Sequence, residues 1–155
     1  MADEQNFDLI LRNVKCVRPN RTTVETGDIA VRSGRIAAVG QVPADAQAAR
    51  VVDGGGKLAF PGLVDAHMHT GIYAPLAEDA LTESRAAAQG GVTTSLNYIR
   101  SGQYYLNKGG PYATLYPEIL EASKGRFYVD YAYHLAPLDA RQIEEIPMLI
   151  SEYGV

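Results

Sequence analysis

Two of the three histidines in this 155-residue chain stand almost side by side, at His67 and His69. In a β-strand, residues i and i+2 point to the same side, so the two imidazoles would be neighbours. Neutral imidazole nitrogens are ligands of zinc, and two of them can share one ion. An H-x-H pair alone is a weak signal of metal binding, because chance or packing explains many such pairs. The neighbouring sequence must therefore show whether the pair belongs to a metal site.

The context is the run PGLVDAHMH, residues 61–69. Leu63 and Val64 favour a buried strand that ends in the histidines. Asp65 precedes His67 by two residues and so points to the same side of that strand. It could orient a histidine ligand, or it could cap a nearby loop or pair with a lysine. The sequence therefore predicts half of a metal site at the carboxyl end of a strand.

The elements on either side of this motif differ in kind. Residues 7–60 hold five short apolar, β-branched runs separated by turn residues, with a polar connection expected over 41–50. This pattern predicts the N-terminal part of a β-sandwich domain, residues 1–60.

After residue 61, strands and helices alternate three times. The strands are expected at 63–69, 92–99 and 127–135, and the helices at 78–89, 115–124 and 139–152. Such βα units form a parallel sheet. A (β/α)₈ barrel takes about 200 residues or more, so residues 61–155 are either a small open α/β sheet or the first portion of a barrel.

Other side chains with chemical potential lie near the predicted strand ends. Asn97 and Tyr98 close the second strand, where barrel enzymes place functional groups, and would contact substrate or anchor a loop by hydrogen bonds. His134 closes the third strand, where we expect a structural or pocket-wall role. Tyr104 and Tyr105 would pack on a substrate ring or form an oligomer contact.

Composition excludes several classes of function. The formal net charge of −4 and the pI near 5.3 argue against a nucleic-acid-binding face. No apolar run approaches the ~20 residues of a membrane span, and the acidic start MADEQNFD lacks the features of a signal peptide. The single cysteine, Cys16, cannot form an intrachain disulfide and is expected to be buried. We expect a soluble, cytoplasmic protein without nucleic-acid or membrane partners.

Several blocks of the sequence resemble the N-terminal third of the amidohydrolase superfamily, in its hydantoinase, dihydropyrimidinase and dihydroorotase branch. The blocks are DLILRNVKCV, GDIAVRSGRIAAVG, VVDGGGKLAFPGLVDAHMH and AAAQGGVTTSLNY, while FYVDYAYHLAP looks most like dihydropyrimidinases. The resemblance implies a (β/α)₈ barrel whose β-sandwich is assembled from both ends of the chain. It also implies one or two metal ions, commonly Zn²⁺, with His67 and His69 as ligands of the more buried ion.

The implied activity is metal-dependent hydrolysis of a cyclic amide C–N bond, as in a hydantoin or dihydropyrimidine ring, with dihydroorotase-type activity as an alternative. The implied substrate is a small cyclic amide or imide, and the implied assembly a homodimer or homotetramer. In this branch a carboxylated lysine on the fourth strand bridges two metals, and further histidines and an aspartate base follow. Lys57, Lys108 and Lys124 lie in predicted turns or loops, so no catalytic residue is assignable in this chain.

Two hypotheses about the function follow, one of an enzyme and one of a non-catalytic protein. The first is a zinc-dependent cyclic amidohydrolase of which residues 1–155 are the front part, inactive and without tightly bound metal by themselves. The second is a non-catalytic scaffold that keeps the fold. The presence of His67 and His69 favours the enzyme.

Overall fold

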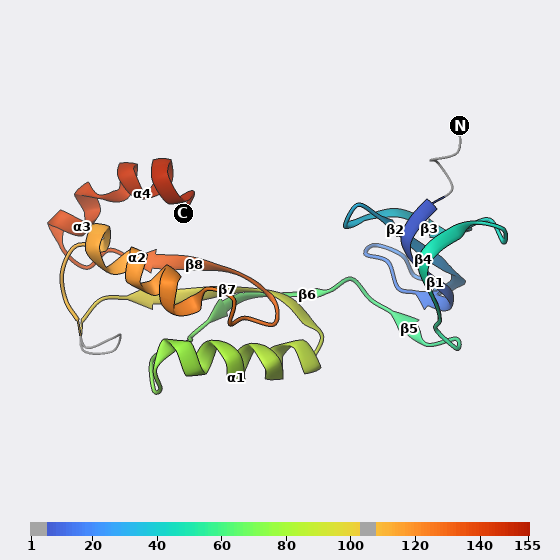
Figure 1. Ribbon diagram of the computed structural model, residues 1–155, viewed down its shortest axis with the longest axis horizontal. Helices are drawn as coiled ribbons and strands as arrows, with labels where there is room; N and C mark the ends of the chain where they lie inside the picture. The colour runs from blue at the N-terminus through green and yellow to red at the C-terminus, as the bar shows by residue number, and fades with distance from the viewer. Residues whose placement is uncertain (1–5, 103–107) are drawn as a thin grey trace. The chain divides into compact units, whose positions relative to one another are not determined.

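The computed structural model describes residues 6–102 and 108–155. The chain divides into two compact units, Met1–Pro61 and Gly62–Val155 (Figure 1). The boundary coincides with the change from strands alone to alternating strands and helices. That the units are parts of a sandwich domain and of a barrel domain stays a prediction.

The described strands of the first unit form one mixed sheet in the order β3-β2-β1-β4, with β5 also pairing with β1. Strand β1 runs antiparallel to β2 and parallel to β4 and β5. Because every pairing extends this one sheet, residues 6–61 supply one layer, and the second layer of the expected sandwich stays a prediction. The strands are β1 (Asn6–Cys16), β2 (Glu25–Arg32), β3 (Arg35–Gly40), β4 (Gln47–Asp53) and β5 (Leu58–Ala59).

The polar connection expected over 41–50 is wrong in its second half, since β4 begins at Gln47. The backbone of β4 pairs with β1 from Gln47 onward, and that pairing overrides the polar composition. The first half is held by Arg12, which donates to the carbonyls of Val42 and Pro43 at 2.9 and 2.8 Å. Arg12 also binds Asp28 at 2.7 Å, which ties β1 to β2. Cys16 is buried, as expected.

The second unit is a parallel sheet with helices, in the strand order β6-β7-β8. In Figure 1, α1 runs beside this sheet. The mixed α/β class is thus confirmed, and closure into a barrel stays a prediction. The elements are β6 (Leu63–Met68), α1 (Leu76–Gln89), β7 (Val92–Arg100), α2 (Tyr112–Ser123), β8 (Asp130–Ala136), α3 (Ala140–Glu144) and α4 (Ile146–Tyr153).

The side chains of the central strand β7 alternate between a buried face, which packs on the helices, and a more exposed face. Ser95, Asn97 and Ile99 are at most 1% exposed, and Ile99 belongs to the core shared with α1, α2, β8 and α4. Tyr98 and Arg100 point to the opposite face, because neighbouring residues of a strand alternate. The helices therefore cover one face of the strand, and the other is left for the side chains that could do chemistry.

The single helix predicted over 139–152 is wrong, because the structure has two helices there. Glu145 lies between α3 and α4, and Pro147 stands in the first turn of α4. Proline has no N–H to donate to the carbonyl of Ile143, so one continuous helix would lose a hydrogen bond there.

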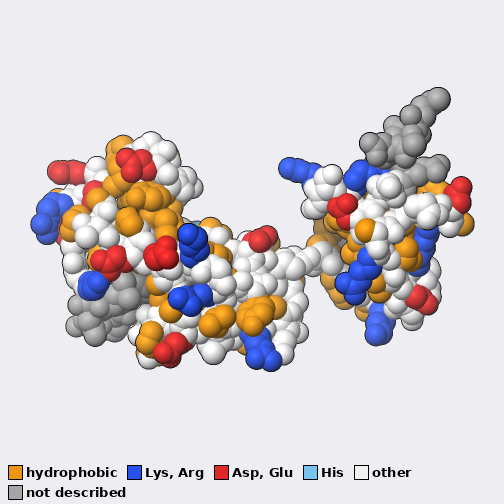
Figure 2. Space-filling model, viewed as in Figure 1, with side chains coloured by type: hydrophobic (Ala, Val, Ile, Leu, Met, Phe, Trp, Pro, Cys, Tyr) orange, Lys and Arg blue, Asp and Glu red, His pale blue; other side chains and the backbone are white. Residues whose placement is uncertain are grey.

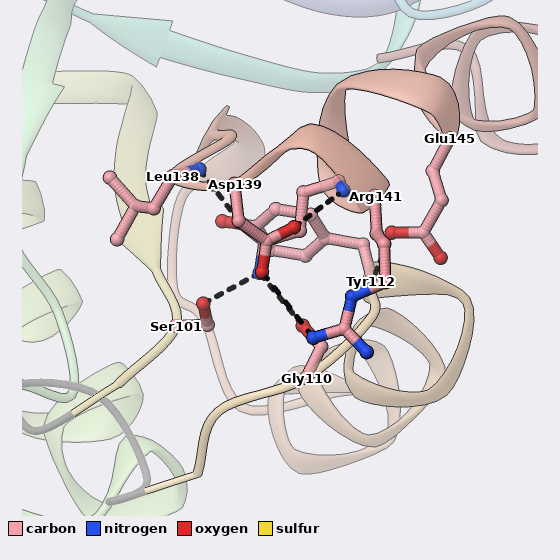
Figure 3. Close-up of polar contacts among 8 residues, drawn as sticks. Ser101, Gly110, Tyr112, Leu138, Asp139, Arg141 and Glu145 are labelled. Atoms are coloured by element: carbon pink, nitrogen blue, oxygen red, sulfur yellow. Dashed lines mark hydrogen bonds and ion pairs between the residues drawn. The ribbon is translucent and has the colours of Figure 1, made fainter.

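Helix α2 starts at Tyr112, three residues before the predicted start. Glu145 lies beside Tyr112 (Figure 3). Its carboxylate accepts hydrogen bonds from the backbone N–H groups of Tyr112 and Ala113, at 2.7 and 2.9 Å. These groups have no partner within the helix, so the distant carboxylate caps the additional turn.

Apolar side chains also reach the surface of the second unit (Figure 2). Leu63 and Val64 on β6 are 57% and 62% exposed, and Ile150 on α4 is 56% exposed. Within the described sheet, β6 and β8 each pair with one neighbour, so both are edge strands. In the described ranges, none of the helices has the length and hydropathy needed to cross a membrane.

A buried polar contact fixes the segment that follows β6. Thr70 donates to Oδ1 of Asn97 at 2.6 Å, and Nδ2 of Asn97 donates to Oγ of Ser95 at 3.1 Å. Thr70 and Asn97 are both 0% exposed. One residue later, the N–H of Gly71 donates to Asp79 in α1 at 2.8 Å. Gly71 has φ +82°, a conformation that glycine adopts without strain.

Replacing Thr70 by valine removes the donor to Asn97 while keeping the shape of the side chain. We expect the free energy of unfolding to fall by about 1–3 kcal/mol, because a buried amide oxygen loses its partner. Thr82→Val is the matched control, since Thr82 is exposed on α1. Urea denaturation of both variants measures the difference, and equal stability of the two would contradict the role given to this bond.

Candidate metal centre

The rings of His67 and His69 converge at the end of β6. Their Nε2 atoms are 2.9 Å apart, and the ring centroids are separated by 4.9 Å. Both side chains are exposed, and they lie on the same side of the chain, as the i, i+2 spacing predicts. The two nitrogens are therefore in direct contact, at a distance at which one ring can donate a hydrogen bond to the other.

The spacing of these nitrogens can be compared with that of zinc ligands. Two nitrogens at 2.0–2.1 Å from a tetrahedral zinc ion lie about 3.3 Å apart. The observed 2.9 Å is close to this value, so the pair fits as two ligands of one ion. In residues 6–102 and 108–155, no group of three or more His, Cys, Asp or Glu side chains is placed to hold a metal. The described residues thus present two ligands, which is half of a four-coordinate shell.

Tyr98 completes an aromatic cluster with the two histidines. Its ring centroid lies 5.5 Å from that of His67 and 5.0 Å from that of His69. Tyr98 is thus on the exposed face of β7, beside the pair, where it can contact a molecule bound there. His134 is its register partner on β8, and its Nε2 lies 3.3 Å from the carbonyl oxygen of Ala66, the residue before His67.

Asn97 and Asp65 are held by other contacts. Asn97 lies on the helix-facing side of β7 and is fully buried, with its amide bonded to Thr70 and Ser95. These are loop-anchoring hydrogen bonds, one of the two roles expected for Asn97 from the sequence. Oδ1 of Asp65 accepts the backbone N–H of His67 at 3.1 Å, so this carboxylate contacts the main chain of the ligand residue instead of its ring.

A pocket of about 560 Å³ opens beside the histidines. Three of its residues, Ile72, Tyr73 and Arg100, are not predicted from the sequence. The two-residue period of a strand could have predicted the position of Arg100, since it stands two residues after Tyr98 on β7 and so shares its face. Tyr73 lies after β6 and had no such signal. Tyr104 and Tyr105 lie outside the described residues. The pocket is lined by His67, His69, Ile72, Tyr73, Tyr98 and Arg100.

The carboxyl ends of β7 and β8 are joined beneath this pocket by Tyr112. Its hydroxyl donates to the carbonyl of Ala136 at 2.8 Å and lies 3.4 Å from that of Ile99. Burial raises the pKa of Tyr112, so the group stays a neutral donor. The strand ends that carry the site are therefore held together by a buried hydrogen bond.

Comparison with known proteins gives a consistent result. No family model matches the chain. Over 94 residues it is 44% identical to an allantoinase of Escherichia coli K12, and the alignment covers 59% of this chain and 19% of that relative. The chain thus spans about a fifth of the length of the curated relatives it matches.

The solved structures agree with the sequence comparison. An L-hydantoinase (dihydropyrimidinase) from Arthrobacter aurescens superimposes with a TM-score of 0.76 at 27% identity, covering 94% of this chain and 31% of that one. A D-hydantoinase from Bacillus sp. AR9 gives a TM-score of 0.75 at 25% identity, covering 95% and 31%. Sequence and fold together show that the chain is similar to the N-terminal portion of enzymes of the amidohydrolase superfamily, among them an allantoinase and two hydantoinases.

Proposed function

We propose that the protein containing this chain hydrolyses the C–N bond of a cyclic amide, such as a hydantoin or dihydropyrimidine ring, with a metal ion bound by His67 and His69. The observation that carries the proposal is the convergence of the two Nε2 atoms, 2.9 Å apart, at the carboxyl end of β6. The names of the similar proteins, allantoinase and hydantoinase, support a ring amide as the substrate class.

The reaction consumes one water molecule. Its oxygen adds to the carbonyl carbon and the ring C–N bond breaks. The nitrogen takes up one proton of the water, the other is released to solvent, and the carbonyl carbon becomes a carboxylate. A bound zinc ion would supply a Lewis acid for the carbonyl and lower the pKa of a water molecule toward neutrality. Neutral imidazole ligands suit this task because they leave the positive charge of the ion intact.

In this proposal, the residues of this chain hold the metal ion and orient its histidine ligands. His67 and His69 provide two ligands, and Asp65 accepts the backbone N–H of His67, which fixes the chain just before the first ligand. Tyr98 lies against both rings and limits their movement on one side. A general base, a metal bridge and the remaining ligands would come from other residues of the protein, and a homodimer or homotetramer is the assembly we propose.

The role of the histidines can be tested in the full-length protein. We expect His67→Ala and His69→Ala each to reduce bound zinc, measured by atomic absorption, and to lower ring-opening activity by more than about a hundredfold, since even the loss of outer contacts to a metal ligand costs 10–100-fold. His134→Ala is the matched control, because His134 is an exposed histidine of the same sheet. It should keep its zinc, because it is not one of the proposed ligands.

Two outcomes would count against the proposal. Zinc content unchanged in both His67 and His69 variants would remove the metal site. A zinc-loaded wild-type protein that opens none of a panel of ring amides, including hydantoin, dihydrouracil, dihydroorotate and allantoin, would favour the scaffold function.

Residues 1–155 expressed alone should be inactive and should bind zinc weakly. Two neutral imidazoles fill half of a tetrahedral shell, so the ion keeps most of its water and exchanges readily. The edge strands β6 and β8 and the exposed Leu63 and Val64 should also favour aggregation. Dialysis against a chelator followed by metal analysis, with light scattering on the same sample, tests both points. A monomer that retains one zinc per chain would contradict this expectation.

A further inference from the structure

We infer that Gln142 is a positioning residue, which sets how tightly the pocket beside the histidines binds a ring without contacting that ring. The inference rests on the proposed function and adds a residue that acts on the same site from outside it. Gln142 lies in α3, is absent from the described lining of the pocket and is 1% exposed. A polar side chain this deeply buried is costly unless its hydrogen bonds are made, so its partners indicate its role.

The partners of Gln142 belong to three segments of the second unit. Its Nε2 donates to Oγ of Ser101 and to the carbonyl of Gly110, both at 2.7 Å. Its Oε1 accepts the N–H of Leu138 at 2.7 Å. Ser101, Gly110 and Leu138 are drawn around this side chain in Figure 3. Because they follow β7, precede α2 and follow β8, one carboxamide connects three segments that would otherwise be separate.

The carboxamide of Gln142 lies where the backbone pairing of two strands ends. The last paired residues of β7 and β8 are Arg100 and Ala136. Beyond this pair, the side chain offers an N–H to Ser101 and a carbonyl oxygen to Leu138, as a peptide group would. It therefore continues the connection between the strands past the last pair. Since Arg100 lines the pocket and directly precedes Ser101, this connection also holds one wall of the pocket.

Helix α3 is held in place by contacts other than the side chain of Gln142. Asp139 caps the helix by accepting the backbone N–H of Gln142 at 3.0 Å. Glu145, which follows the helix, accepts the N–H groups of Tyr112 and Ala113 at the start of α2. Removal of the carboxamide should therefore loosen the strand ends while α3 stays docked on α2.

The histidines are held by a different contact, which separates their position from that of the pocket wall. The bond from Thr70 to Asn97 fixes the segment after His69 and involves no residue of α3. A change at Gln142 should thus disturb binding of the ring more than the metal ligands. This predicts a higher KM with an unchanged kcat. A purely structural role predicts the reverse, because a smaller folded fraction lowers the apparent kcat and leaves KM unchanged.

Gln142→Met in the full-length protein tests the inference, because it keeps the length of the side chain and removes its donors and its acceptor. The probe is whichever ring among hydantoin, dihydrouracil, dihydroorotate and allantoin the wild type binds most tightly. We expect KM to rise about tenfold and kcat to change by less than about threefold, with bound zinc unchanged. Calorimetry on the metal-free protein should show the same loss of affinity for the ring. Ser101→Ala, which removes one of the three partners, should give a smaller loss in the same direction.

Ser84→Ala is the matched control, because it removes a buried hydrogen bond from the opposite edge of the sheet. Ser84 is 2% exposed in α1, and its hydroxyl accepts the N–H of Tyr128, just before β8, at 3.0 Å. This variant should lose stability, measured by urea denaturation, and should keep the KM and the ring affinity of the wild type.

The outcomes separate this inference from the proposed function. Unchanged KM and affinity in folded Gln142→Met, or in Ser101→Ala where Gln142→Met does not fold, would overturn the inference and leave ring hydrolysis intact. An equal loss of affinity in Ser84→Ala would do the same. A wild type that binds a ring without opening it, and loses that binding in Gln142→Met, would overturn the proposed function and keep the inference. A wild type that neither binds nor opens any of the four rings would overturn both.

Discussion

The arrangement of the candidate site depends on one buried hydrogen bond, from Thr70 to Asn97. It joins the segment after β6 to the middle of β7, where neither partner is exposed to water. In this environment an unpaired amide is costly, so the bond has a strong preference to form. It sets where the chain leaves β6, and the pairing of Met68 with Asn97 sets the height of the histidines along the sheet. Both histidines and Tyr98 then meet above the same strand end.

The parallel strand order has a second effect on the site. All three strands of the second unit end at the same edge, so residues that are far apart in sequence become neighbours there. His69, Arg100 and Ala136 lie at or just beyond three different strand ends. Tyr112 holds the ends of β7 and β8 through the carbonyls of Ile99 and Ala136, and Gln142 holds the residue after β7 through the hydroxyl of Ser101. The reactive side chains thus stand on the fixed part of the unit, which is where precise positioning is possible.

Much of this arrangement follows from local sequence patterns. The two-residue period of a strand places His67 beside His69, and the strand-helix alternation predicts the parallel sheet. The same period shows that Asn97 and Tyr98 face opposite sides, so that they could not both contact one ligand. What the sequence could not supply are long-range contacts. The cap that Glu145 places on α2 spans 33 residues, and the start of β4 depends on pairing with β1. The pocket position of Tyr73 depends on the path of the chain after Gly71, which no local pattern describes.

The cap on α2 has a consequence for the order in which the protein forms. The N–H groups of Tyr112 and Ala113 leave the ribosome well before Glu145, which follows 33 residues after Tyr112. Until then the first turn of α2 has only water as a partner, and Ser101 likewise waits for Gln142. The strand end that carries Arg100 therefore reaches its final form only after the α3 and α4 region has been synthesised and has docked. The partners that hold this strand end are thus among the later residues of the chain to be synthesised.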